Sequence, residues 1–72
     1  MDEKRNKLPE RLLQLRKEAN LTQKELAEKL NMNSVTYLHY EKGQREPSLD
    51  TLLDFADFFS VSVDFLIGKT DY

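Results

Sequence analysis

Residues 21–43 read LTQKELAEKLNMNSVTYLHYEKG and contain the clearest local signals of structure in the chain. The segment Thr22-Gln-Lys-Glu25 is a capping box, in which the threonine side chain accepts from the Glu25 N–H and the glutamate accepts from the Thr22 N–H. Apolar residues follow at helical spacing until the pattern breaks at Asn31. The stretch therefore predicts a short helix over 22–30.

A second helix is expected after only three residues, Asn31-Met32-Asn33. Asparagine tolerates the left-handed conformation better than most residues, so Asn31 is expected in a tight turn. Asn33 is the expected N-cap of a helix that runs to about Lys42, and Gly43 ends it. Two short helices joined in this way are typical of a helix-turn-helix, whose second helix, here about 33–42, places its residues in the major groove of DNA.

The flanking sequence predicts three further helices. The first ends at Asn20 and repeats its apolar residues on one face, at Leu8, Leu12, Leu15 and Ala19. Ser48 is expected to cap a helix over 49–59, and Ser62 a short helix over 63–67 that Gly68 stops. Because no strand pattern is sustained, the predicted fold class is all-α with five helices. The residues of 49–59 that spacing places in the core are Leu49, Leu52, Leu53, Ala56 and Phe59.

The composition limits the classes of protein that the chain can represent. Its 72 residues predict a single domain over 1–72, with 1–7 as a flexible N-terminal arm. Cysteine is absent and histidine occurs once, which excludes disulfides and argues against a metal site. No signal peptide is visible and no apolar run approaches the roughly 20 residues that cross a bilayer. We therefore expect a cytoplasmic protein with no membrane partner, and DNA binding would place it at the nucleoid.

Charge is distributed unevenly along the chain. The net charge is −2, but residues 1–46 carry ten Lys and Arg against eight Asp and Glu. Residues 47–72 carry one lysine against five aspartates. This asymmetry is expected if only one face of the molecule meets a polyanion.

The chain resembles the lambda-repressor-like helix-turn-helix domains of phage repressors and bacterial regulators, the XRE family. The resemblance extends from about Leu12 to Gly68, and it implies a five-helix fold with the helix-turn-helix at the second and third helices. It rests on the order and spacing of several short pieces, namely Leu15-Arg16, Leu21-Thr22-Gln23, Glu25-Leu26-Ala27, Leu30, Tyr40-Glu41-Lys42-Gly43, Arg45-Glu46-Pro47, Leu52-Leu53, Ala56 and Val61-Ser62-Val63-Asp64-Phe65-Leu66-Ile67-Gly68.

The resemblance also implies roles for particular residues. Gln23 would contact phosphate from the start of the second helix. Arg16 would pair with Glu41 and so tie the first helix to the third. The residues that would line the groove-facing side of the third helix are Ser34, Val35, Leu38 and His39. Flanking phosphate or base contacts would come from Asn33, Thr36, Lys42, Gln44 and Arg45.

The sequence departs from the family pattern at several of these positions. The groove-facing set contains no Arg, Gln or Asn, although direct readout usually relies on such side chains. Val35 and Leu38 would instead contact thymine methyl groups, or belong to the core if the helix is rotated. Tyr37 stands where the family usually has a β-branched aliphatic residue, and Ser60 where it favours glycine.

Several apolar residues near the C-terminus have two possible roles. Phe55, Phe58, Phe65, Ile67 and Tyr72 either form a second small cluster of the core or make a homodimer contact. We expect the homodimer, because modules of this type usually bind palindromic sites in pairs. The predicted dimer patch consists of Phe58, Phe65, Ile67 and Tyr72.

These patterns predict a sequence-specific binder of double-stranded DNA that acts as a transcriptional regulator, either a phage or mobile-element repressor or an autorepressor. The same patterns also fit the N-terminal DNA-binding part of a longer repressor. No nucleophile–base pair or Gly-rich phosphate loop is present, so we expect no enzyme, cofactor or small-molecule ligand. The alternative is an antitoxin-like protein-interaction module, favoured by the acidic balance and the apolar Val35–Leu38 face.

Overall fold

The ends of the helices follow the capping residues that the sequence supplies. In the computed structural model, which describes residues 7–71, the Thr22 hydroxyl accepts from the Glu25 N–H at 3.0 Å, and Glu25 Oε1 accepts from the Thr22 N–H at 2.8 Å. The Asn33 side chain accepts from the two N–H groups of Val35 and Thr36. Ser48 accepts from the Thr51 N–H and Ser62 from the Phe65 N–H, which caps the helices over 49–59 and 63–67.

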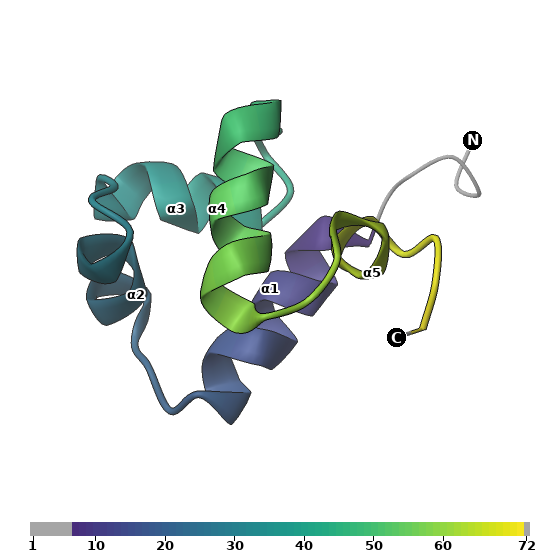
Figure 1. The fold of residues 1–72 in the computed structure, drawn as a ribbon. Coiled ribbons are helices and arrows are strands. Elements are labelled where there is room, and N and C mark those ends of the chain that lie inside the picture. Colours follow the sequence, from purple (N-terminus) through teal and green to yellow (C-terminus); the bar gives the residue numbers. More distant parts are fainter. Residues whose placement is uncertain (1–6, 72) are drawn as a thin grey trace.

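The described residues form five helices, with no strand among them (Figure 1). The all-α prediction is therefore confirmed, and the last two helices have the predicted bounds. The helices are α1 (Leu8–Glu18), α2 (Gln23–Lys29), α3 (Ser34–Glu41), α4 (Leu49–Phe59) and α5 (Val63–Ile67).

A residue with positive φ follows each helix of the described chain. Gly43 and Gly68 take this conformation after α3 and α5. The other three are not glycines: Asn20, Asn31 and Ser60 have φ of 59°, 54° and 57°. The tight turn predicted at Asn31 is thus present, and Ser60 adopts the conformation for which glycine is the favoured residue.

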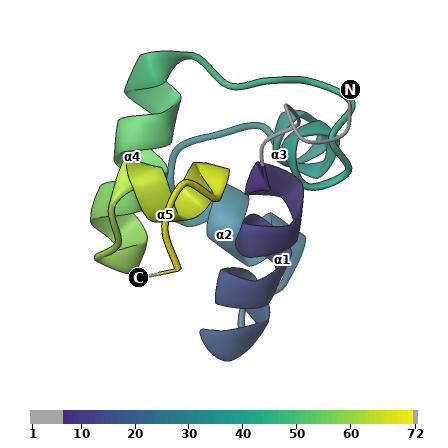
Figure 2. The same cartoon turned by 90° about the vertical axis from the view of Figure 1, so that its right-hand side faces the viewer.

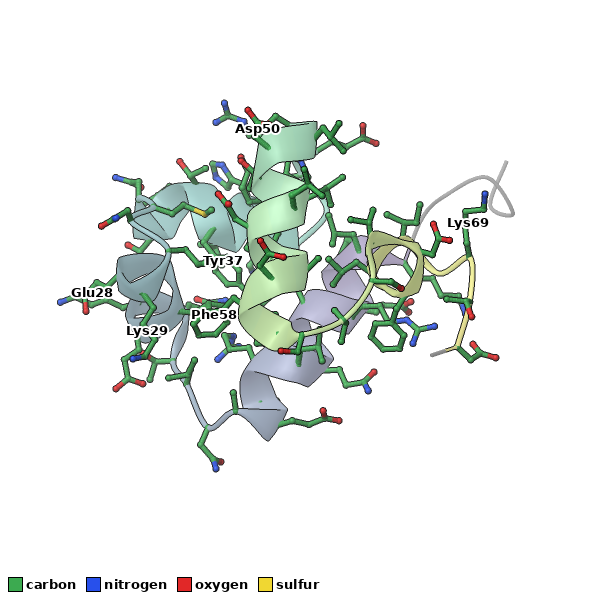
Figure 3. The ribbon with its side chains drawn as sticks, viewed as in Figure 1. Glu28, Lys29, Tyr37, Asp50, Phe58 and Lys69 are labelled. Atoms are coloured by element: carbon green, nitrogen blue, oxygen red, sulfur yellow. The ribbon has the colours of Figure 1, made fainter. Side chains whose placement is uncertain are left out.

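Each of the five helices contributes one large, fully buried side chain to the core. These five residues are Leu12, Leu26, Tyr37, Phe55 and Leu66. The rings of Tyr37 and Tyr40 both meet the Phe55 ring edge-on, with centroids 6.0 and 6.1 Å apart. Tyr37 therefore lies between α3 and α4, as Figure 3 shows.

The arrangement leaves α3 supported from one side. Helix α3 packs against α1 and α2. Helix α5 packs against α1 and α4. Figure 1 shows α2 and α3 on one side of α4 and α5 on the other, and Figure 2 shows α5 in front of the gap between α4 and α1. Lys7, the last residue of the predicted arm, donates its N–H to the Ile67 carbonyl at 3.1 Å, whereas residues 1–6 lie outside the described part.

The predicted inner face of α4 was partly wrong. Leu49 and Leu53 are 66% and 46% exposed, whereas Phe55 is fully buried. Burying a phenylalanine ring between two tyrosines removes more apolar area from water than burying a leucine, so the helix is rotated to place Phe55 inward. The residues that face the core are Leu52, Phe55, Ala56 and Phe59.

Two smaller expectations were also wrong. Ala19 is exposed, because α1 ends at Glu18 and the chain turns away there. Phe65 is only 9% exposed, since α5 packs against α1 and the Arg11 guanidinium lies 4.1 Å from the ring centroid. Among residues 7–71, no helix has the length and apolar character needed to cross a membrane.

Candidate nucleic-acid interface

The two sides of α3 have different surroundings. Tyr37 and Tyr40 are buried against the rest of the protein. A helix turns by about 100° per residue, so Val35, His39 and Lys42, spaced by four and three residues, lie in one row on the opposite side. We call these three residues the outer row of α3.

Exposure agrees with this placement of the outer row. Val35 is 56% exposed, Lys42 is exposed and His39 is half-buried. The alternative that placed Val35 in the core of a rotated helix is therefore wrong. Leu38 is half-buried and flanks the row, so it contributes less surface than Val35.

The remaining predicted contact residues surround the outer row. Ser34 is exposed at the start of α3, and Thr36 is half-buried on the other flank. The Asn33 side-chain oxygen is engaged in capping α3, which leaves its amide nitrogen as the group that can donate to a ligand. Gln44 and Arg45 are exposed in the loop that follows α3.

The inner side of α3 is fixed by an ion pair with α1. Arg16 Nε donates to Glu41 Oε2 at 2.7 Å, and Arg16 Nη2 donates to Glu41 Oε1 at 3.1 Å. Arg16 Nη1 also donates to the Leu21 carbonyl at 2.8 Å. The structure thus brings Arg16 and Glu41 together in the bidentate geometry that gives such pairs directional strength.

Two further side chains complete the environment of Glu41. Tyr37 Oη donates to Glu41 Oε2 at 2.6 Å, and Gln23 Nε2 donates to Glu41 Oε1 at 2.8 Å. Each carboxylate oxygen therefore accepts two hydrogen bonds. Gln23, which the family resemblance assigns to phosphate, retains its carbonyl oxygen and one N–H for such a contact.

The hydrogen bonds determine the charge state of this cluster. Burial would raise the pKa of Glu41, but the bonds from Arg16, Tyr37 and Gln23 outweigh it and hold the pKa below its ordinary value. Burial, followed by the hydrogen bond to Glu41, raises the pKa of Tyr37. The hydrogen bond to Glu41 also raises the pKa of Arg16. The cluster consequently holds a carboxylate, a guanidinium and a neutral phenol at neutral pH.

The cluster connects α1, the start of α2 and α3, and it thereby fixes the direction in which the outer row points. Sequence reasoning identified Arg16 and Glu41 but missed that Tyr37 and Gln23 also donate to the carboxylate. The spacing of Tyr37 and Glu41 was the available signal, because residues four apart lie on one face of a helix.

The apolar surface predicted for a dimer differs from the one that the structure presents. Phe58 is exposed, Ile67 is half-buried and Phe65 is buried, while Tyr72 lies outside the described residues. Figure 3 shows Phe58 on the side of α4 toward α2. Leu49 and Leu53 lie one turn apart on the opposite flank, and the side chains between the two flanks are Asp50, Asp54 and Asp57.

The amino-acid sequence is similar to those of known helix-turn-helix proteins. A family model described as helix-turn-helix matches residues 12–66. The HTH-type transcriptional regulator ImmR of Bacillus subtilis is 44% identical over 64 residues, which cover 89% of this chain and 50% of ImmR. The cryptic phage CTXphi transcriptional repressor RstR of Vibrio cholerae is 35% identical over 63 residues, which cover 88% of this chain and 56% of RstR.

A solved structure has the same arrangement of helices. The crystal structure of a transcriptional regulator from Listeria innocua matches with a TM-score of 0.82 and 33% sequence identity. The match covers 89% of this chain and 60% of that one. This chain spans about half the length of the curated relatives ImmR and RstR.

Proposed function

Because this chain belongs to the helix-turn-helix family, we propose that it binds double-stranded DNA sequence-specifically and acts as a transcriptional regulator. The observation that carries the proposal is the outer row of α3, which is directed away from the core by a cluster of hydrogen bonds on the opposite side of the same helix. A helix presented in this way fits the major groove.

In this proposal the residues divide by the part of DNA that they contact. Ser34, Val35, Leu38 and His39 face base edges, while Lys42 and Arg45 bring positive charge to the phosphates beside the groove. Further contacts to the DNA backbone are made by Gln23, Asn33, Thr36 and Gln44. The phosphate contacts give affinity, and the base contacts give the choice of sequence.

The names of the relatives support a repressor. RstR is a transcriptional repressor of a cryptic phage, and ImmR is a transcriptional regulator. We therefore propose repression of a phage or mobile-element promoter, or of the protein's own promoter, by a DNA complex that blocks polymerase. The site of action is the cytoplasm, at the nucleoid, and regulation by binding requires no catalytic step.

The proposed binding unit is a homodimer on a palindromic operator. Two copies of α3 would then enter successive major grooves about 34 Å apart. The exposed leucines Leu49 and Leu53 on α4 support this part of the proposal, because an apolar flank of a helix is stabilised when a second copy covers it. Phe65 is buried and cannot take part in the contact without unpacking α5 from α1.

Fluorescence anisotropy tests the proposal. The protein is titrated into labelled duplexes that it has selected from random DNA and, separately, into scrambled duplexes of equal composition. Both titrations are made at about 50 and about 200 mM salt. We expect tighter binding to the selected duplex, a steep loss of affinity at the higher salt, and weaker binding to both duplexes by Arg45→Ala. Glu28→Ala, on the exposed side of α2, is the control for the arginine substitution.

The same experiment distinguishes DNA binding from the alternative function, that of a protein-interaction module. A protein-interaction module is favoured by one observation, the exposed apolar Val35 on the face that the proposal assigns to DNA. Such a module would bind neither duplex at low salt from a folded sample, and its contact with an apolar partner would respond little to ionic strength.

A further inference from the structure

One residue of the outer row has no role in the fold. Val35 is 56% exposed at the second position of α3, and the core does not require it. Valine is also not favoured by the helix itself, because a β-branched side chain loses rotamer freedom in a helix and has a lower helix propensity than alanine. An exposed apolar side chain on the proposed DNA-facing surface therefore calls for a chemical explanation.

The major groove offers few partners for a valine. Guanine, adenine and cytosine present hydrogen-bonding groups there, and a valine that covers them removes water without replacing its hydrogen bonds. Thymine alone presents an apolar group, the C5-methyl, beside its O4 acceptor. Contact between this methyl group and the valine methyl groups removes apolar surface from water on both sides.

Neighbouring side chains favour such a contact. Leu38 is half-buried one turn further along α3 and extends the apolar surface beside Val35. His39 and Lys42 continue the outer row toward the C-terminal end of the helix, where they can donate to base or phosphate oxygens. The outer row is therefore apolar at the start of α3 and polar toward the C-terminal end of the helix.

We propose that Val35 is a specificity-determining residue that selects a thymine, through its C5-methyl group, in each half of the operator. This inference rests on the proposed DNA binding and adds the identity of one base to it. At a rise of 1.5 Å per residue, His39 lies about 6 Å further along the helix than Val35. His39 therefore faces a different base from the one that Val35 contacts.

The test removes single methyl groups from the DNA. Duplexes are selected from random DNA by the wild-type protein, and each thymine of the selected site is replaced in turn by deoxyuridine, which differs only in lacking the C5-methyl group. Dissociation constants are measured by anisotropy for the wild type and for Val35→Ala. Leu13→Ala is the matched control, because Leu13 is an exposed leucine on α1, away from the proposed contact surface.

We expect one thymine in each half-site at which deoxyuridine weakens wild-type binding about fourfold, as the loss of one buried methyl group predicts. For Val35→Ala this penalty disappears at that position alone, whereas Leu13→Ala retains it. Circular dichroism is expected to show the same helix content for all three proteins, since Val35 and Leu13 are both exposed.

Two results would overturn the inference while leaving DNA binding intact. One is a selected site with no thymine that meets this description, and the other is a deoxyuridine penalty that is equal in wild type and Val35→Ala. Failure of the folded wild-type protein to enrich any duplex would instead refute the proposed function, and the inference with it.

Discussion

At the scale of single residues, the carboxylate of Glu41 is the most heavily engaged group that the structure describes. It is shielded from water and accepts from a guanidinium, a phenol and an amide. Each donor compensates part of the cost of burying a charge, so loss of one donor leaves an acceptor partly unsatisfied. The positions of Arg16, Gln23, Tyr37 and Glu41 are therefore energetically coupled.

Tyr37→Phe isolates one of these hydrogen bonds. The ring remains to fill its place against Phe55, but the donor to Glu41 is lost, so we expect a loss of about 1.5–3 kcal/mol in unfolding free energy. Urea denaturation measures it. Tyr40→Phe is the matched control, because its ring contacts the same Phe55 and its hydroxyl meets no carboxylate in the described structure. Equal losses in both variants would contradict the role of the hydrogen bond.

Acid sensitivity follows from the lowered pKa of Glu41. A carboxyl whose pKa is lower in the folded state contributes stability above its unfolded pKa of about 4.5, and this contribution is lost as pH falls through the folded value. We expect wild-type stability to decrease below about pH 4.5 and the difference between wild type and Glu41→Gln to shrink there. Urea denaturation at several pH values measures both, and Glu28→Gln, which changes an exposed side chain of α2, is the control.

At the scale of the elements, local signals predicted where helices begin and end. The capping side chains of Thr22, Asn33, Ser48 and Ser62 determined most of these positions, since they act within a few residues of the backbone groups they satisfy. Which face of α4 is buried could not be predicted in the same way. That choice depends on the aromatic rings of α3, which are distant in sequence and meet Phe55 only in the fold.

The candidate site shows the same division. Its outer row could be predicted, because helical spacing and family resemblance place Val35 and His39 on the surface of α3. The hydrogen bonds of Gln23 and Tyr37 to Glu41 could not, because they require the packing of three helices around a single carboxylate. A side chain assigned to DNA by resemblance, Gln23, therefore also has a structural partner.

The end of α4 gives a prediction about conformational strain. Ser60 has a φ of 57°, which costs a non-glycine residue roughly 1–2 kcal/mol, whereas glycine loses roughly 0.5–1 kcal/mol more backbone entropy on folding. We expect Ser60→Gly to stabilise the protein by about 0.5–1 kcal/mol, seen as a higher melting temperature. Ser62→Gly, which removes the hydroxyl that caps α5, should have the opposite sign. A lower melting temperature for Ser60→Gly would show that the turn is unstrained.

At the scale of the whole molecule, α4 separates surfaces of different character. Its exposed aspartates lie between Phe58 on one flank and Leu49 with Leu53 on the other, whereas the outer row of α3 contains no acidic residue. A polyanion is repelled by the aspartates, which favours approach from the α3 side. The apolar flank of α4 remains available to a second copy in such a complex.

Analytical ultracentrifugation tests the proposed dimer through this flank. We expect the wild type to sediment as a dimer that dissociates on dilution, and Leu53→Ser to remain monomeric at concentrations where the wild type associates. Leu13→Ser, which changes an equally apolar exposed residue on α1, should behave like the wild type. A wild-type protein that stays monomeric at high micromolar concentration would rule out the homodimer.

The two-sided construction of α3 has a consequence for how such proteins can diverge. The buried rings and the hydrogen bonds around Glu41 that hold α3 against the core lie on one side of the helix, while the outer row projects from the other side and shares none of those hydrogen bonds. New side chains can therefore be exchanged into the outer row, by natural drift or by grafting from a relative, without disturbing the scaffold. One fold can in this way come to recognise many operators, while the side chains on the buried side of α3 can stay the same among relatives.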